Sequence, residues 1–272
     1  MLFRSVPWAR LAGGLGLVAT SAAIYWLTSS AAFAVDPAAI PVRGGSWTDA
    51  AAVRQAMALP DGVAVNIFRL PTIALEERIE GLASVRAARV RAVLPDLVEV
   101  TIEERDPVLV WQTDGGTWLV DGGGRLFAFR PEAEEGDGLP APLVSDRRVA
   151  SPAATGATLD AADLAVARRL AAVTPERIRS AAPSLALELR DEEGWVVTAP
   201  GGWEAVFGIY TATVRPPSMI AAQVQCLGAL IAAREPTLRR ILLAPGPETC
   251  GTFIGGAGDR RPRPTPRGSA TP

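Results

Sequence analysis

The longest uncharged stretch of the chain lies close to its N-terminus. No charged residue stands between Leu11 and Ala34, two arginines precede this stretch, and the first charge after it is Asp36. As a helix it would be roughly 36 Å long, enough to cross a hydrocarbon core of about 30 Å. The pattern predicts a transmembrane helix over residues 11–34. Because positive residues favour the cytoplasmic side, residues 1–10 would be cytoplasmic and the bulk of the chain extracytoplasmic.

A cleaved signal peptide is the alternative interpretation of this stretch, because Ala32-Phe33-Ala34 fits the small-x-small cleavage pattern. The apolar run exceeds the usual length of a signal core. Tyr25 and Trp26 stand near its outer end, where aromatic side chains anchor a helix at the interface. The sequence therefore favours an anchor and leaves cleavage before Val35 open.

Residues 35–106 change from apolar runs to alternating and helical patterns that predict a β-α-α-β-β module. Leu97 to Ile102 alternates with period two, whereas Leu75, Ile79 and Leu82 recur at helical spacing. This order predicts a three-stranded sheet with two helices on one face. The expected elements are a strand at 40–42, helices at 49–57 and 75–82, and strands at 85–92 and 97–102.

Residues 107–254 predict a mostly antiparallel β domain with two helices, which makes the fold class α+β. The second helix, capped by Ser218, precedes the last expected strand at 238–244. Residues 131–157 indicate a long loop, and 255–272 are too poor in apolar residues to fold. The other expected elements are strands at 109–111, 117–120, 126–129, 185–189, 195–198 and 203–207, and helices at 159–170 and 219–234.

Composition excludes several kinds of chemistry. The chain of 272 residues has no histidine, which removes Ser–His and Cys–His nucleophile pairs and most zinc sites. No lysine stands where a Ser–Lys dyad would need one, and a net charge of −2 gives no reason to expect a nucleic-acid partner. We therefore expect no catalytic, cofactor or metal site, no small-molecule substrate and no enzymatic activity.

Two motifs that could suggest ligands have simpler explanations. Asp121-Gly-Gly-Gly124 lacks the Lys-Ser/Thr and the following helix of a phosphate loop, so a hairpin turn is the better interpretation. Glu76, Glu77 and Glu80 lie within one expected helix, where a solvated helix face is commoner than a cation site.

An ordered series of short motifs follows the expected elements from residue 40 to residue 127. It runs through Ile40-Pro-Val42-Arg-Gly44, Gly62, Asn66-Ile-Phe68, Leu94-Pro95, Val98-Glu-Val100, Glu104-Arg105-Asp-Pro107-Val108, Trp111, Leu119-Val-Asp121 and Gly124-Arg-Leu-Phe127. The series resembles the POTRA domain and the following β domain of the FtsQ/DivIB cell-division family. The residues that carry the most specific part of the motif are Glu104, Arg105, Pro107, Asp121 and Gly124.

The resemblance implies a membrane-anchored, non-enzymatic scaffold of the septation machinery. Such a protein would sit in the plasma membrane at the division site and recruit small single-pass division proteins. A POTRA protein of envelope transport is an alternative, although the residues after 107 are too short and too interrupted by helices for a barrel. An exported soluble protein, released by signal cleavage, is the other.

The last expected strand is the candidate partner surface. In the resembled family, late strands of the β domain pair with a strand of a small division protein, and an open edge suits such pairing. Arg239 and Arg240 would meet an acidic partner or be solvated. The segment departs from the family because Ile241-Leu-Leu-Ala-Pro245 lacks the usual Asp and Arg. The candidate residues are Leu238, Arg239, Arg240, Ile241, Leu242 and Leu243.

Cys226 and Cys250 are the two cysteines of the chain. Thiols outside the cytoplasm tend to pair. We hypothesise a disulfide that ties the expected helix at 219–234 to the chain after the last strand.

Overall fold

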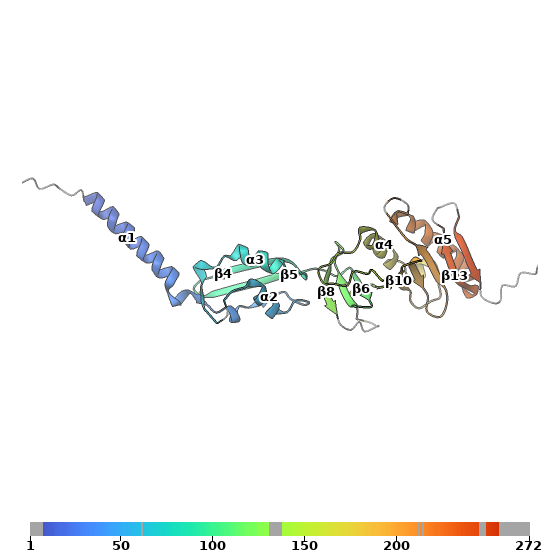
Figure 1. Ribbon diagram of the computed structural model, residues 1–272, viewed down its shortest axis with the longest axis horizontal. Coiled ribbons are helices and arrows are strands. Elements are labelled where there is room, and N and C mark those ends of the chain that lie inside the picture. Colours follow the sequence, from blue (N-terminus) through green and yellow to red (C-terminus); the bar gives the residue numbers. More distant parts are fainter. Residues whose placement is uncertain are drawn as a thin grey trace, which may run out of the picture. The chain divides into compact units, whose positions relative to one another are not determined.

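The structure is a computed structural model that describes residues 8–60, 62–130, 138–211, 213, 215–244 and 249–255. Residues 8–11 are described by their backbone alone. The chain forms two compact units, Met1–Arg105 and Asp106–Pro272 (Figure 1). This division falls one residue before the predicted boundary at 106/107. Of the sequence predictions, the cytoplasmic residues 1–7, part of the 131–157 loop and the tail beyond 255 lie outside the described residues.

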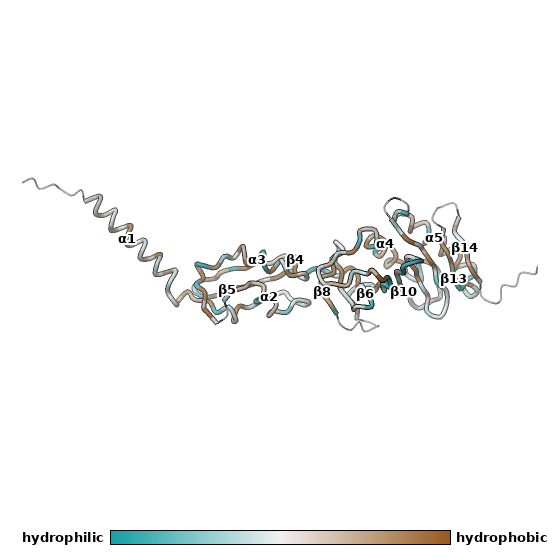
Figure 2. Tube along the Cα trace, in the orientation of Figure 1, coloured by the Kyte–Doolittle hydropathy of each residue, from teal (hydrophilic) through white to brown (hydrophobic). Residues whose placement is uncertain are grey.

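Helix α1 (Trp8–Ser29) opens the first unit and ends five residues before the predicted end at Ala34. At this end of the helix the Asn66 side-chain amide donates to the carbonyl oxygen of Leu27 at 2.9 Å, where the last carbonyl groups lack partners within the helix. Apolar residues alternate with residues of intermediate hydropathy along α1 (Figure 2). Within the described residues, no helix combines the length and the apolar character needed to cross a membrane.

The first unit contains a three-stranded sheet in the order β2-β5-β4, with β2 parallel and β4 antiparallel to β5 (Figure 1). This is the predicted β-α-α-β-β order, to which the structure adds a short β1–β3 pair. The elements are β1 (Ala34–Val35), η2 (Pro37–Ala39), β2 (Val42–Arg43), α2 (Ala50–Met57), β3 (Val65–Asn66), η3 (Ile67–Arg69), α3 (Thr72–Glu80), β4 (Val85–Val93) and β5 (Leu97–Glu104).

The core of this unit forms where the two helices meet the sheet. Met57 of α2 and Leu75 and Ile79 of α3 are fully buried, and so is Val100 of β5. Asp49 caps α2, because its carboxylate accepts a hydrogen bond from the Ala51 amide at 3.1 Å. The helical and alternating patterns thus converge on one hydrophobic layer.

The second unit contains a nine-stranded sheet in the order β14-β13-β12-β11-β10-β9-β6-β7-β8. Strand β9 joins its two halves, because it pairs in parallel with both β6 and β10. The strands are β6 (Leu109–Thr113), β7 (Gly116–Val120), β8 (Leu126–Arg130), β9 (Leu143–Asp146), β10 (Ala186–Arg190), β11 (Gly194–Thr198), β12 (Glu204–Gly208), β13 (Leu238–Leu243) and β14 (Gly251–Gly255).

Helices α4 (Ala161–Ala171) and α5 (Ile220–Arg234) lie along the same side of this sheet (Figure 1). Leu170 of α4 and Leu227 of α5 are buried in the core that the inward-facing strand residues share. The remaining turns are η4 (Glu176–Ile178), η5 (Pro217–Met219) and η6 (Glu235–Thr237).

Three predictions for the second unit are wrong. The predicted loop at 131–157 contains β9, whose four residues stand among prolines and glycines that hide the strand pattern. Ser218 does not cap α5, because it lies inside η5 and Met219 occupies the N-cap position. The strand at 238–244 is not the last, because β14 follows it.

Candidate functional site: the C-terminal edge of the sheet

Strand β13 lies inside the sheet, which corrects the prediction that it is an open edge. It pairs in parallel with β12 through Glu204, Ala205 and Val206. On its other side it pairs with β14 in antiparallel orientation, so that Ile241 lies opposite Phe253. Backbone groups along both sides of β13 therefore face a neighbouring strand, and β14 forms the edge.

The side chains of β13 divide between the core and the outer face. Leu238 and Ile241 are fully buried and Leu243 is 5% exposed, because all three face the core beneath α5. Leu242 points to the other face and is 40% exposed. Of the candidate apolar residues, only Leu242 has the exposure that a partner contact requires.

The two candidate arginines differ in their surroundings. Arg240 donates to a carboxylate oxygen of Glu204 at 2.5 Å and forms an ion pair with Glu193. Arg190 joins the same cluster, 2.7 Å from Glu193 and 3.4 Å from Glu204. Arg240 therefore secures β13 to its neighbours on the outer face, whereas the exposed Arg239 is the better candidate for an acidic partner.

Strand β14 carries one apolar side chain on each face. Phe253 is half-buried against the core, and the Arg234 guanidinium lies over its ring at 5.3 Å from the centroid. Ile254 lies on the outer face and is 60% exposed. Together with Leu242, it gives the outer face of the edge an apolar surface.

Cys226 and Cys250 are joined by a disulfide in the structure, with their Cα atoms 5.2 Å apart. Cys226 lies on α5 and is half-buried against the core, whereas Cys250 is exposed and directly precedes β14. The bond therefore attaches the residue before the edge strand to the helix that covers β13.

A buried glutamine that sequence reasoning missed fixes the end of β13. The Gln223 side-chain amide donates to the carbonyl oxygens of Ala244 at 3.0 Å and Phe207 at 3.3 Å. Its own amide oxygen accepts a hydrogen bond from the Tyr210 hydroxyl, and burial raises the pKa of that hydroxyl despite the nearby Arg215. The sequence does contain a signal for this role, because Gln223 is a polar residue at a helix position whose neighbours on the same face are apolar.

Glu104 and Arg105, from the family motif, join segments of the first unit. The Glu104 carboxylate accepts hydrogen bonds from the backbone amides of Ser46 at 2.6 Å and Trp47 at 2.9 Å. The Arg105 side chain donates to the carbonyl oxygen of Ala83 at 3.0 Å. The structure thus gives both residues positions that hold loops on the sheet rather than a shared ligand site.

Asp121, Gly124 and Pro107 form a corner of the second unit. Asp121 is 7% exposed, and its carboxylate accepts the amides of Gly123 and Arg125, both at 2.9 Å, as a hairpin turn requires. Gly124 has a φ of +84°, and a Cβ there would lie 3.2 Å from the Leu164 side chain. Pro107 stands just before the residue at which pairing with β7 begins.

The glutamates of α3 have a role that the sequence did not reveal. Glu76 accepts a hydrogen bond from the Val90 amide at 2.8 Å, and Glu80 accepts one from the Ala88 amide at 3.0 Å. Both amides belong to β4, the edge strand of the three-stranded sheet. These carboxylates therefore occupy backbone donors that an added strand would need.

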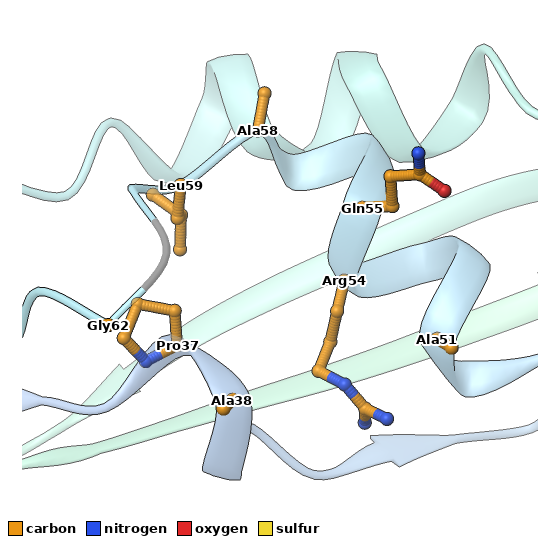
Figure 3. A pocket seen from close by; sticks show the side chains of 8 residues that line it. All are labelled: Pro37, Ala38, Ala51, Arg54, Gln55, Ala58, Leu59 and Gly62. Atoms are coloured by element: carbon orange, nitrogen blue, oxygen red, sulfur yellow. The ribbon is translucent and has the colours of Figure 1, made fainter.

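A cavity of about 450 Å³ lies beside α2 in the first unit (Figure 3). Among the described residues that line it, Arg54 is the one ionisable side chain, and its guanidinium is 3.5 Å from the Ile40 carbonyl oxygen. Arg54 and Gln55 leave α2 in different directions (Figure 3). Most of the remaining lining is alanine, proline and glycine, which offers no arrangement for acid–base or nucleophilic chemistry.

Comparison with known proteins identifies the first unit. Residues 37–105 match the family described as "POTRA domain, FtsQ-type". Over 76 residues, 28% of this chain, the sequence is 36% identical to the cell division protein FtsQ of Mycobacteroides abscessus. Over 164 residues, 60% of this chain, it is 29% identical to the cell division protein FtsQ of Chloroflexus aurantiacus. The chain thus carries an FtsQ-type POTRA domain and is similar to cell division proteins FtsQ.

The family resemblance drawn from the motifs is thereby confirmed. The two matches span 24% and 50% of the respective relatives, so the chain covers half their length or less. The POTRA match ends at Arg105, where the first unit also ends.

Proposed function

We propose that this chain is a non-enzymatic, membrane-anchored scaffold of the bacterial cell-division machinery. The FtsQ-type POTRA domain at residues 37–105, followed by a separate β unit, carries this proposal. The names of the two relatives support a role in division. In this role the POTRA and β units recruit other division proteins, and confinement to a membrane raises the effective concentration of modest binders.

The anchor proposal rests on the N-terminal segment. Residues 11–34 contain no charged side chain. Leu15, Leu17 and Ile24 of α1 are exposed, which suits a surrounding of lipid rather than of water. Tyr25 and Trp26 stand near the end of the helix that adjoins the first unit, at the level where an interface would hold aromatic rings.

The non-enzymatic assignment is supported by the use that the structure makes of its carboxylates. Glu104 and Asp121 of the family motif accept backbone amides in turns, and Glu76 and Glu80 accept amides of a strand. Each of these four carboxylates thus holds part of the fold. The absence of histidine removes the commonest general base at neutral pH.

The C-terminal edge of the sheet is the proposed recruitment surface. Leu242 and Ile254 expose apolar side chains on its outer face, and Arg239 is exposed on β13. An extended segment that carries apolar and acidic residues fits this surface, because strand addition supplies backbone hydrogen bonds while side chains select the partner.

A localisation experiment tests the proposal. A fluorescent fusion of the full chain, in cells depleted of the native copy, is expected to concentrate at mid-cell and to restore division. The double variant Leu242→Glu/Ile254→Glu should reduce recruitment of division proteins to that site. Val149→Glu is the matched control, because Val149 is 96% exposed elsewhere in the second unit. Uniform distribution of the unaltered fusion would argue against a role in division.

The anchor is tested separately on the same cells. We expect the chain to remain in the membrane fraction after alkaline extraction with its N-terminal segment intact. The variant Leu17→Arg/Val18→Arg should release it, because each arginine costs about 2.5–3.5 kcal/mol at the centre of a membrane helix. A soluble mature chain that begins at Val35 would show that the segment is a cleaved signal instead.

A further inference from the structure

Strand β14 is attached to the sheet much more weakly than the strand that it covers. In β13, Leu238, Ile241 and Leu243 are buried in the core. In β14 all five residues are exposed or half-buried, and two of them are glycines. Burial of apolar surface is the main source of strand stability, so little of it favours the attached state of β14.

Three contacts hold β14 in place. The backbone pairs with β13 from Leu243–Gly251 to Leu238–Gly255. Phe253 packs against the core below Arg234. The Cys226–Cys250 disulfide fixes the residue before β14 to α5. The first two are noncovalent and can open reversibly, whereas the disulfide holds the start of β14 beside α5 until the bond is cleaved.

We propose that β14 is a replaceable cover on β13, held in place by the Cys226–Cys250 disulfide, and that an extended segment of a partner protein takes its place when the disulfide is opened. This inference rests on the proposed function and narrows it, because the partner segment pairs with β13 in place of β14, so that Leu242 stays in the recruitment surface while Ile254 leaves it with β14. With β14 in place, the backbone groups on that side of β13 are paired within the chain. With β14 released, the same groups form an edge that accepts a strand.

The position of β14 indicates the chemistry of the segment that replaces it. Opposite Ile241 the segment carries a large apolar side chain, as Phe253 does, which packs against the core below Arg234. The next position, opposite Arg240, faces the outer side of the sheet and carries an apolar residue, as Ile254 does. Acidic residues flank these positions in the partner, because Arg234 and Arg239 are exposed beside them.

Opening of the disulfide is a thiol–disulfide exchange with a dithiol reductant. One thiolate of the reductant attacks a sulfur of the bond, for which the exposed Cys250 offers the better access. A mixed disulfide forms and the Cys226 sulfur leaves as a thiolate. The second thiol of the reductant then displaces the Cys250 sulfur. Two electrons and two protons pass to the protein, which gains two thiols, and the reductant becomes a cyclic disulfide.

A peptide-capture experiment on the purified full chain tests the proposal. The probe is a fluorescein-labelled peptide of residues 249–255 in which Cys250→Ser removes the thiol. By fluorescence anisotropy, the variant Cys226→Ser/Cys250→Ser is expected to bind it at least about tenfold more tightly than the oxidised chain, because the internal copy competes less well once its covalent constraint is lost. A probe with Phe253→Ala should lose most of this binding.

Hydrogen exchange on the same samples reports the cover directly. In the Cys226→Ser/Cys250→Ser variant, amides of Leu238–Leu243 should exchange about tenfold faster or more, while amides of β10 and β11 keep their protection. Should this variant fail to fold, Phe253→Ala with the disulfide intact provides the second test. It should also bind the probe more tightly than the unaltered chain does.

Two outcomes would overturn the replacement model. Equal capture by the oxidised chain and both variants would mean that the probe adds to the outer side of β14. Absence of capture by all of them would mean that β13 does not accept a strand. Mid-cell localisation of the Cys226→Ser/Cys250→Ser fusion separates this result from the proposed function: a fusion that localises normally leaves the division role intact, whatever the peptide does.

Discussion

The two units of the chain protect the edges of their sheets in different ways. In the POTRA unit, β4 directs backbone amides outward, and Glu76 and Glu80 of α3 accept them. In the β unit, a whole strand covers β13, and a disulfide holds the start of that strand on α5. Both arrangements occupy groups that would otherwise pair with another chain.

The difference lies in how easily each protection can be removed. Glu76 and Glu80 belong to a helix whose Leu75 and Ile79 are fully buried, so the helix keeps them beside β4 as long as the core of the unit is intact. Strand β14 carries no such core residue within its five described positions, and one covalent bond outside the strand retains it. The first edge is therefore protected by residues that the core of the unit keeps in place, whereas the second is closed conditionally.

The largest expected effect comes from loss of the disulfide. The variant Cys226→Ser/Cys250→Ser should lower the free energy of unfolding of the second unit by about 3 kcal/mol, as for a loop of this length. Denaturant unfolding followed by the fluorescence of the buried Trp111 and Trp195 measures this change. Equal thiol labelling of the unaltered protein with and without reductant would contradict the disulfide itself.

Removal of a glutamate from α3 should have the next largest effect. Glu76→Ala leaves the Val90 amide without its charged acceptor, which costs about 2 kcal/mol in the first unit. The exposed edge should also allow concentration-dependent association, which sedimentation velocity detects. Glu77→Ala is the matched control, because Glu77 lies on the exposed side of the same helix. Identical behaviour of the two variants would show that Glu76 does not guard β4.

Much of the fold followed from local patterns. The period-two run from Leu97 to Ile102 predicted β5, and Leu75 with Ile79 predicted α3, because in both the apolar spacing matches the buried face. Strand β9 could not be predicted, since its four residues gain their place only by pairing with β6 and β10, far away in the sequence.

The candidate site was predicted only in part. The Cys226–Cys250 disulfide could be predicted, because thiols in the expected extracytoplasmic compartment tend to pair. The open edge at β13 was wrong because β14 has two glycines and a single inward apolar residue, too weak a pattern to announce a strand. Glu76 could not be matched to Val90 from the sequence, since the direction of a strand amide depends on register with its neighbour.

A smaller effect is expected from truncation of Phe253, the side chain of β14 that faces the core. Phe253→Ala removes a half-buried ring and its contact with the Arg234 guanidinium, which should cost about 1–2 kcal/mol at the edge. Hydrogen exchange should show faster opening of β14 with little change in global unfolding. Ile254→Ala is the control, because Ile254 is 60% exposed on the outer face. An equal acceleration in the control would show that the inward contact does not retain the strand.

The smallest expected effect is a pH dependence at the start of β13. Burial of Glu235 acts to raise its pKa, but hydrogen bonds from the Ser180 hydroxyl, the Ala181 amide and the Trp203 indole outweigh it and lower the pKa below 4.5. A lowered pKa in the folded state means that the carboxylate stabilises the fold above the unfolded pKa, and that this contribution is lost as pH falls through the folded value.

Exchange of the Leu238 amide, which follows η6, should therefore accelerate as the pH falls below about 4.5, beyond the change in intrinsic exchange rate. Glu235→Gln keeps the shape of the side chain and should remove this pH dependence while costing about 1 kcal/mol at neutral pH. Glu192→Gln, which changes an exposed glutamate in the turn after β10, is the control. If the Glu235→Gln variant kept the acid response of the unaltered chain, another carboxylate would be responsible. Opening at the start of β13 would then not depend on the carboxylate of Glu235, which lies just before Leu238.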